Sequence, residues 1–142
     1  MKDIKLAEEN EKKKEYLKSY RRAVRREKEI EDEIRQLRLD KMFPSVVNDG
    51  MPKGTNQSDL SGYAALLDEQ ISELIQERYK RAKLRADIEN SIRAMENEDE
   101  QRVLRLRYIR GLKWEEIAVE IKYSYMQTHR IHSMALINFH ML

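Results

Sequence analysis

The chain has 142 residues, enough for one ordinary domain or two very small ones, and 38% of them are charged. Its 28 basic and 26 acidic residues leave a net charge of only +2, so a nucleic-acid-binding function would have to rest on local charge patterning. The absence of cysteine excludes disulfides and thiolate metal sites, and no apolar run is long enough to span a membrane. We therefore expect a soluble, cytoplasmic protein without membrane contact and without a cofactor.

The first segment, residues 3–42, has no glycine or proline and is dense in lysine, arginine and glutamate. Its apolar residues recur at alternating spacings of four and three, with Glu27 filling one gap, which is typical of a coiled-coil seam. The seam comprises Tyr16, Tyr20, Ala23, Ile30, Ile34 and Leu37, and it is widened by Leu17 and Val24. Since such a helix is marginal alone, the pattern predicts that it packs against a partner helix.

Residues 43–61 are rich in turn-forming residues and predict a loop. A second helix is predicted from Ser58 or Ser61 to about Met95, with an apolar stripe along one side. The stripe comprises Leu60, Leu67, Ile71, Leu74, Ile75, Leu84, Ile88, Ile92 and Met95, and it is thinned in the middle by Ala82 and Ala86. Residues 1–96 are thus predicted to form a coiled-coil-like helical hairpin, although each helix can equally pair with a second copy of the chain, because both arrangements bury the same stripes.

Residues 97–142 predict a separate module of three helices, which makes the whole chain all-α. Asn97 is placed to cap the first of these helices, and Glu100 is placed to reach back to it as in a capping box. This helix runs to about Arg110, a turn follows at Gly111–Lys113, and the last two helices meet at a break over residues 122–124. Its expected core residues are Val103, Leu104, Tyr108 and Ile109.

The last two helices carry the pattern of a helix-turn-helix, in which two short helices cross around a tight turn. Ala118 is the small residue where they would touch, and Ser124 is placed to cap the second helix. The residues expected to face inward are Ile117, Ile121, Tyr123 and Ile131. The residues expected to face outward are Tyr125, Met126, Gln127, His129, Arg130 and Ser133.

The stretch DEQRVLRLRYIRGLKWEEIAVEIKYSYMQTHRIHSMAL resembles region 4 of bacterial sigma factors, which reads the promoter −35 element. The whole chain is also similar to small phage and prophage transcription regulators of Gram-positive bacteria that place a helical hairpin before such a module. The resemblance implies that the second helix enters the major groove. The positions that it matches to base-reading residues are Ser124, Tyr125, Gln127, His129 and Arg130, and the outward Ser133 joins them as a candidate. Lys122 departs from the pattern, because many such motifs have glycine in a left-handed turn there.

The side-chain chemistry indicates how these residues would read DNA. Gln127 can bind adenine and Arg130 can bind guanine, while Tyr125 and Met126 can contact thymine methyl groups. The candidates for phosphate contacts are Arg102, Arg105, Arg107, Arg110 and Lys113, although this basic run can also be an ordinary solvated helix face. Trp114 is expected in the core rather than against a base.

These features favour a sequence-specific transcription regulator that binds double-stranded DNA on phage or prophage promoters together with RNA polymerase, and that can dimerise through its N-terminal helices. Two alternatives are a phage DNA-packaging recognition subunit and a coiled-coil adaptor that binds only protein. No paired acid and base or activated nucleophile indicates an enzyme. His129 and His132 lack the further ligands of a metal site, and the segment Gly50–Thr55 lacks the lysine placement of a phosphate-binding loop.

Overall fold

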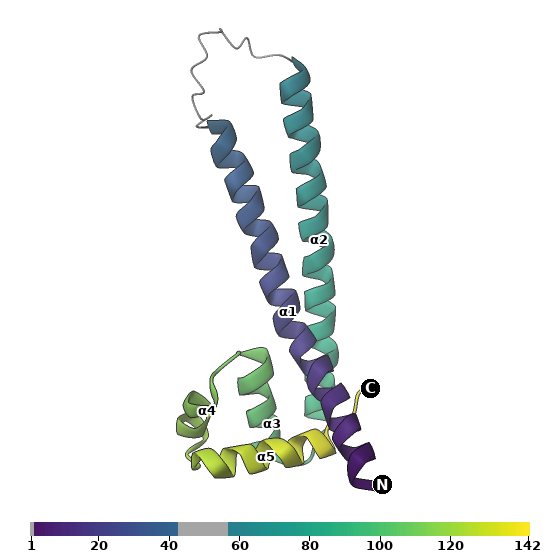
Figure 1. Cartoon of the computed structure of the whole chain (residues 1–142), viewed down its shortest axis with the longest axis vertical. Helices are drawn as coiled ribbons and strands as arrows, with labels where there is room; N and C mark the ends of the chain where they lie inside the picture. Colours follow the sequence, from purple (N-terminus) through teal and green to yellow (C-terminus); the bar gives the residue numbers. More distant parts are fainter. Residues whose placement is uncertain (1, 43–56) are drawn as a thin grey trace. The chain divides into compact units, whose positions relative to one another are not determined.

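The computed structural model describes residues 2–42 and 57–142 (Figure 1). The described chain is all-α, as the sequence predicts. Its elements are α1 (Lys2–Met42), α2 (Gln57–Arg93), α3 (Glu98–Leu104), the π-helical segment η1 (Arg105–Ile109), α4 (Trp114–Ile121) and α5 (Tyr125–Asn138). The predicted loop ends too late, because residues 57–61 already belong to α2. The rest of that loop, including Gly50–Thr55, lies outside the described residues.

The chain forms two compact units, which do not coincide with the predicted boundary at residue 96. One unit consists of residues 25–80, and the other combines residues 1–24 with residues 81–142. Each of the long helices α1 and α2 therefore contributes one part to the first unit and another part to the second. The physical reason is the distribution of buried apolar residues, which form separate clusters in the two units.

In the unit of residues 25–80, parts of α1 and α2 run in opposite directions as a helical pair (Figure 1). Ile30 and Ile34 of α1 are buried together with Leu74 of α2. Two members of the predicted α2 stripe do not belong to this core, because Leu60 is 45% exposed and Ile75 is 62% exposed. Within this unit the two helices thus pair inside one chain, which was one of the two arrangements open from the sequence.

Ion pairs flank the core of this helical pair. Arg78 lies 3.1 Å from a carboxylate oxygen of Glu27 and 2.8 Å from one of Glu31. Arg26 lies 2.8 Å from a carboxylate oxygen of Glu73 on the opposite helix. Since both arginine side chains are more than half exposed, solvent screens these pairs and each contributes little to the stability of the fold. Their main effect is to favour this register of α1 against α2.

In the other unit, the ends of the long helices share one hydrophobic core with the C-terminal helices. The first part of α1 supplies Leu17 and Tyr20, and the last part of α2 supplies Ile88 and Ile92. The core is completed by Met95, Leu104, Tyr108, Ile109, Ala135, Leu136 and Phe139. Residues from α3, η1 and α5 therefore pack on α1 and α2 in this core, whereas Ile117 and Ile121 of α4 belong to a second cluster.

Two cations of α1 cap the ends of C-terminal helices. The Lys13 ammonium donates hydrogen bonds to the carbonyl oxygens of Leu136 (2.9 Å) and Ile137 (3.1 Å), in the last turn of α5. The Arg21 guanidinium donates to the carbonyl oxygen of Ile109 (3.1 Å), at the end of η1. Helix C-termini leave carbonyl groups without partners and carry partial negative charge, so cations placed there are stabilising.

The start of α3 follows the predicted cap only in part. The Asn97 side chain accepts a hydrogen bond from the backbone N–H of Glu100 (3.0 Å), which confirms Asn97 as the N-cap. The buried Glu100 carboxylate, predicted to reach back to Asn97, accepts a hydrogen bond from Asn138 Nδ2 (2.6 Å). The predicted helix to Arg110 changes at residue 105 into η1, whose wider turns bond Arg110 N to Arg105 O. The predicted core residues Val103, Leu104, Tyr108 and Ile109 are all buried.

Candidate nucleic-acid interface

A tight turn over residues 122–124 joins α4 to α5. Lys122 adopts the left-handed conformation (φ 62°, ψ 38°), which costs a non-glycine residue about 1–2 kcal/mol. The turn is closed by a hydrogen bond from Tyr123 N to Ala118 O (3.2 Å). Ser124 caps α5, because its hydroxyl accepts a hydrogen bond from the backbone N–H of Gln127 (3.1 Å). The predicted break and the predicted cap are both confirmed.

The inward positions of α4 and α5 agree with the prediction except at Tyr123. Ile117, Ala118 and Ile121 are buried, and Ile131 packs against their cluster. Tyr123 is 40% exposed, and its hydroxyl donates a hydrogen bond to Asp99 Oδ2 (2.7 Å). The prediction of a core position for Tyr123 is therefore wrong, since a polar partner on α3 holds the phenol at the surface.

The outer face of α5 is exposed and mostly apolar. Tyr125 is 49% exposed, Met126 66% and Met134 52%, and Arg130 and Ser133 are exposed beside them. These five residues line a shallow hollow together with the half-buried His129. The sequence contains no aspartate or glutamate after Glu120, so no acidic side chain of α5 opposes an anionic ligand on this face. Arg130 supplies its one strong cation.

Met134 was not among the predicted site residues. It follows Met126 by eight positions and Arg130 by four, which is the spacing that keeps residues on one face of a helix. Extending the predicted outer face by one helical turn would have included it. The other outer candidates, Ser124 and Gln127, lie at the first turn of α5, where Ser124 is exposed and Gln127 is half-buried.

The opposite face of α5 is held by a buried polar pair in addition to apolar packing. Thr128, Ala135 and Leu136 are buried there, and His132 is only 6% exposed. His132 Nε2 and the Tyr108 hydroxyl oxygen lie 2.7 Å apart and share a hydrogen bond. Burial, with smaller contributions from nearby cations, lowers the pKa of His132 from 6.5 to about 4, so its ring is neutral at pH 7.

A series of tilted ring contacts lies at the start of α5. The Arg107 guanidinium lies 4.7 Å from the Trp114 ring centroid, which lies 4.5 Å from that of His129. The His129 ring in turn lies 4.5 Å from the ring of Tyr125. Trp114 thus serves as packing, as expected. The His129 Nε2 atom is buried without a hydrogen-bond partner in the described structure, so this arrangement places His129 under the outer face rather than on it.

Two of the five phosphate candidates are engaged within the chain. Arg105 is half-buried and pairs with Glu89 at 3.1 Å. Arg107 donates to the carbonyl oxygen of Leu112 (3.0 Å), across the turn that precedes α4. These contacts give both side chains a structural role and leave them less available to an external phosphate.

The other three candidates, Arg102, Arg110 and Lys113, are exposed. Arg102 makes a long hydrogen bond to the backbone carbonyl of Glu120 (3.5 Å), and Arg110 lies 3.8 Å from the Glu120 carboxylate. Since exposed pairs of this kind are weak, both arginines can exchange these contacts for a stronger anion. The structure therefore leaves three exposed candidates for phosphate contacts, where the sequence suggested five.

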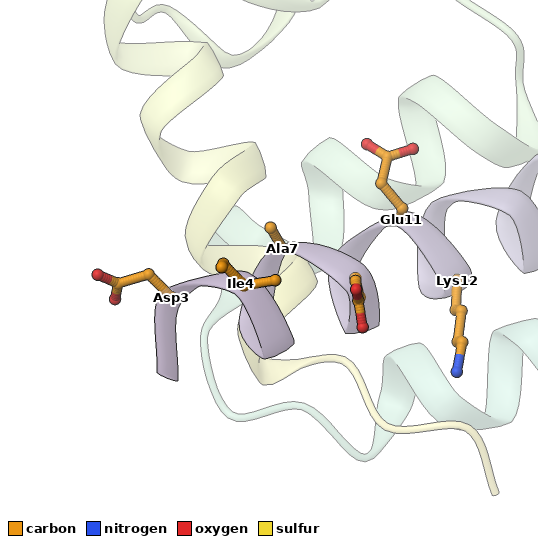
Figure 2. Close-up of a pocket in the computed structure, with 6 residues that line it drawn as sticks. Asp3, Ile4, Ala7, Glu11 and Lys12 are labelled. Atoms are coloured by element: carbon orange, nitrogen blue, oxygen red, sulfur yellow. The ribbon is translucent and has the colours of Figure 1, made fainter. Parts of the chain in front are cut away.

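Elsewhere the described residues offer little chemistry. A shallow hollow beside the first turns of α1 is lined only by exposed residues of that helix, among them Ile4, Ala7 and Glu11 (Figure 2). Within residues 2–42 and 57–142, no histidine, aspartate and glutamate side chains gather into a set that could hold a metal ion. No helix in the described part of the chain is long and apolar enough to cross a membrane.

Compared with known proteins, the chain matches no protein-family model, no curated protein and no solved structure.

Proposed function

We propose that this chain is a transcription regulator that binds double-stranded DNA through the outer face of α5. The observation that carries the proposal is the combination of an exposed α5 face free of acidic side chains with a buried opposite face, directly after a capped tight turn. A helix held in this way is free to enter a major groove. The apolar side chains suit thymine methyl groups, and Arg130 suits guanine.

The proposed roles follow the positions of the side chains. Arg130 and the half-buried Gln127 read base edges, with Tyr125 and Met126 in apolar contact with thymine. Ser124 and Ser133 are exposed at either side of these residues and can donate to bases or phosphates. The exposed cations Arg102, Arg110 and Lys113 supply phosphate contacts. By its resemblance to sigma region 4, we propose that the protein acts with RNA polymerase on phage or prophage promoters.

Selection of duplexes from a random DNA pool by the full chain tests this proposal. We expect the wild type to enrich a defined motif, and Arg130→Ala to lose the preference for one base pair of that motif. A bidentate contact to guanine is worth about 1–3 kcal/mol, so the discrimination at that position should fall roughly 5- to 150-fold. The readout is the affinity of each variant for the motif and for its single-base-pair mutants.

Arg25→Ala is the matched control, because Arg25 is exposed on α1 in the unit of residues 25–80. It should leave both the motif and the discrimination unchanged. The proposal fails if the wild type enriches no motif and retains no duplex at low salt. It also fails in its assignment to α5 if Arg130→Ala selects the same motif with unchanged discrimination.

One observation favours a second candidate, the protein-binding adaptor. Met126 and Met134 expose a flexible apolar surface of the kind that protein partners bind. An adaptor would bind RNA polymerase or another protein tightly through this face and would retard no DNA at low salt. The two candidates thus give opposite results in the same DNA-binding measurement.

A further inference from the structure

The helix α2 has a second seam, on the side that does not pack against α1. In the unit of residues 25–80, six exposed positions recur at alternating spacings of four and three residues along this side. They are Ser61, Ala65, Asp68, Ser72, Ile75 and Tyr79. The same spacing continues along α2 to Ala82 and Ala86, which are also exposed. Apart from Asp68, this outer seam carries no charge, on a helix that is otherwise densely charged.

Ile75 and Tyr79 are the largest side chains of the outer seam, and they are 62% and 69% exposed. They lie one helical turn apart and form an apolar contact point in the middle of the seam. The small residues on both sides of them would allow the backbone of a second helix to approach closely. A seam with this spacing is the surface that a coiled-coil partner covers.

The charges of α2 indicate which helix that partner is. Residues 57–77 contain five acidic residues and no basic one, whereas residues 78–93 contain six basic residues and two acidic ones. Glu73, Glu77 and Arg78 pair with α1 within the chain, but the exposed charges beside the outer seam keep this asymmetry, with Glu69 in the acidic half and Lys83 and Arg85 in the basic half. Two copies of α2 that run antiparallel place these acidic and basic positions opposite each other. A parallel pair would place like charges together, which is unfavourable.

We propose that a second copy of the chain covers the outer seam, with the two α2 helices antiparallel and Ile75 of each against Tyr79 of the other. In this register the two-fold axis lies close to residue 77, where the charge of the helix changes sign. In this homodimer the α1–α2 pair inside each chain stays intact. It therefore differs from the arrangement in which each helix exchanges its partner for the helix of a second copy. It does not depend on the proposed DNA binding.

Sedimentation equilibrium of the full chain tests the dimer. The wild type should have twice the chain mass of 17.1 kDa, and it should dissociate more readily as salt is raised, because the charges are exposed. Ile75→Lys and Tyr79→Lys should each be monomeric at a concentration where the wild type is dimeric. Leu66→Lys is the matched control, since Leu66 is exposed about a third of a turn away from the middle of the outer seam, and it should stay dimeric.

Circular dichroism spectra show whether each variant is folded. All variants should retain the helical content of the wild type, so that a loss of the dimer is not a loss of the fold. A wild type that is monomeric overturns the proposal. So does a folded Tyr79→Lys variant that dimerises as tightly as the wild type.

Cross-linking tests the orientation, and it is simple because the chain has no cysteine of its own. In the proposed register residue 68 faces residue 86 of the other copy. A mixture of Asp68→Cys and Ala86→Cys should therefore form a disulfide-linked heterodimer under mild oxidation. Asp68→Cys alone should form none, because its two sulfurs would be separated by about 27 Å along the helices. Efficient linkage of Asp68→Cys to itself would contradict the antiparallel orientation.

Discussion

Replacing Leu17 by alanine is expected to destabilise the C-terminal helices by about 2–5 kcal/mol, although Leu17 lies far from them in the sequence. The Leu17 side chain has no exposed surface and shares its core with Leu104, Leu136 and Phe139. Its truncation leaves a cavity in that core. Trp114 is the only tryptophan of the chain, so its fluorescence during urea unfolding reports directly on the C-terminal helices.

Leu39→Ala is the control for this experiment, because Leu39 is 42% exposed on the same helix. It should change the free energy of unfolding by no more than about 0.5 kcal/mol. A Leu17→Ala variant whose Trp114 transition coincides with that of the wild type would show that residues 97–142 fold without α1. The shared core described above would then be incorrect.

Acidification is expected to destabilise the same unit through His132. The pKa of His132 is lowered from 6.5 to about 4 in the folded chain, chiefly by burial, so the unfolded chain binds the proton more readily. The stability that depends on the neutral ring is fully present above pH 6.5 and is lost as the pH falls toward 4. The loss should reach about 2–3 kcal/mol near pH 4.5.

Urea unfolding followed by circular dichroism at pH 7 and about pH 4.5 measures this loss. Carboxylates also titrate in this range, so the decisive quantity is the difference between the wild type and His132→Leu. The variant should be less stable at pH 7, because the Tyr108 hydroxyl loses its partner, but it should lose about 2–3 kcal/mol less on acidification. Ser133→Ala, at an exposed position of the same helix without an ionisable side chain, should keep the full pH dependence of the wild type. Equal pH dependence in wild type and His132→Leu would rule out this role.

Local signals in the sequence were sufficient to predict much of this fold. Asn97 and Ser124 are capping residues directly before apolar periodic segments, and both cap as expected. The positions of Ile117 and Ile121 follow from helical spacing, and both are buried. Such features depend on neighbours within one or two turns, and these neighbours are visible in the sequence.

Contacts between distant residues could not be predicted in this way. Nothing in the charged pattern of α1 distinguishes Lys13 and Arg21, which cap α5 and η1, from the solvated lysines and arginines around them. The same packing against α1 buries Phe139, directly after α5 ends at Asn138. The ring centroids of Tyr16 on α1 and Phe139 lie 6.2 Å apart. For that reason the sequence could not show that residues on both sides of position 96 share one core.

The candidate site was predictable in its outline but not in its composition. Helical spacing identifies the face of Met126 and Arg130, but it cannot show that His129 lies between Trp114 and Tyr125. It also cannot show that Arg105 is paired with Glu89, because that contact joins two different helices. Both facts reduce the set of residues on which the proposed DNA binding can rest.

Chemical-shift mapping of the isotope-labelled full chain with its selected duplex tests the central claim most directly. We expect the largest amide and side-chain changes at Tyr125, Met126, Arg130 and Ser133, and smaller changes near Arg102 and Lys113. Residues of the unit 25–80 should shift little. Binding that leaves the signals of the α5 outer face unchanged, or that shifts only the long helices, would contradict the proposal that α5 is the helix that reads DNA.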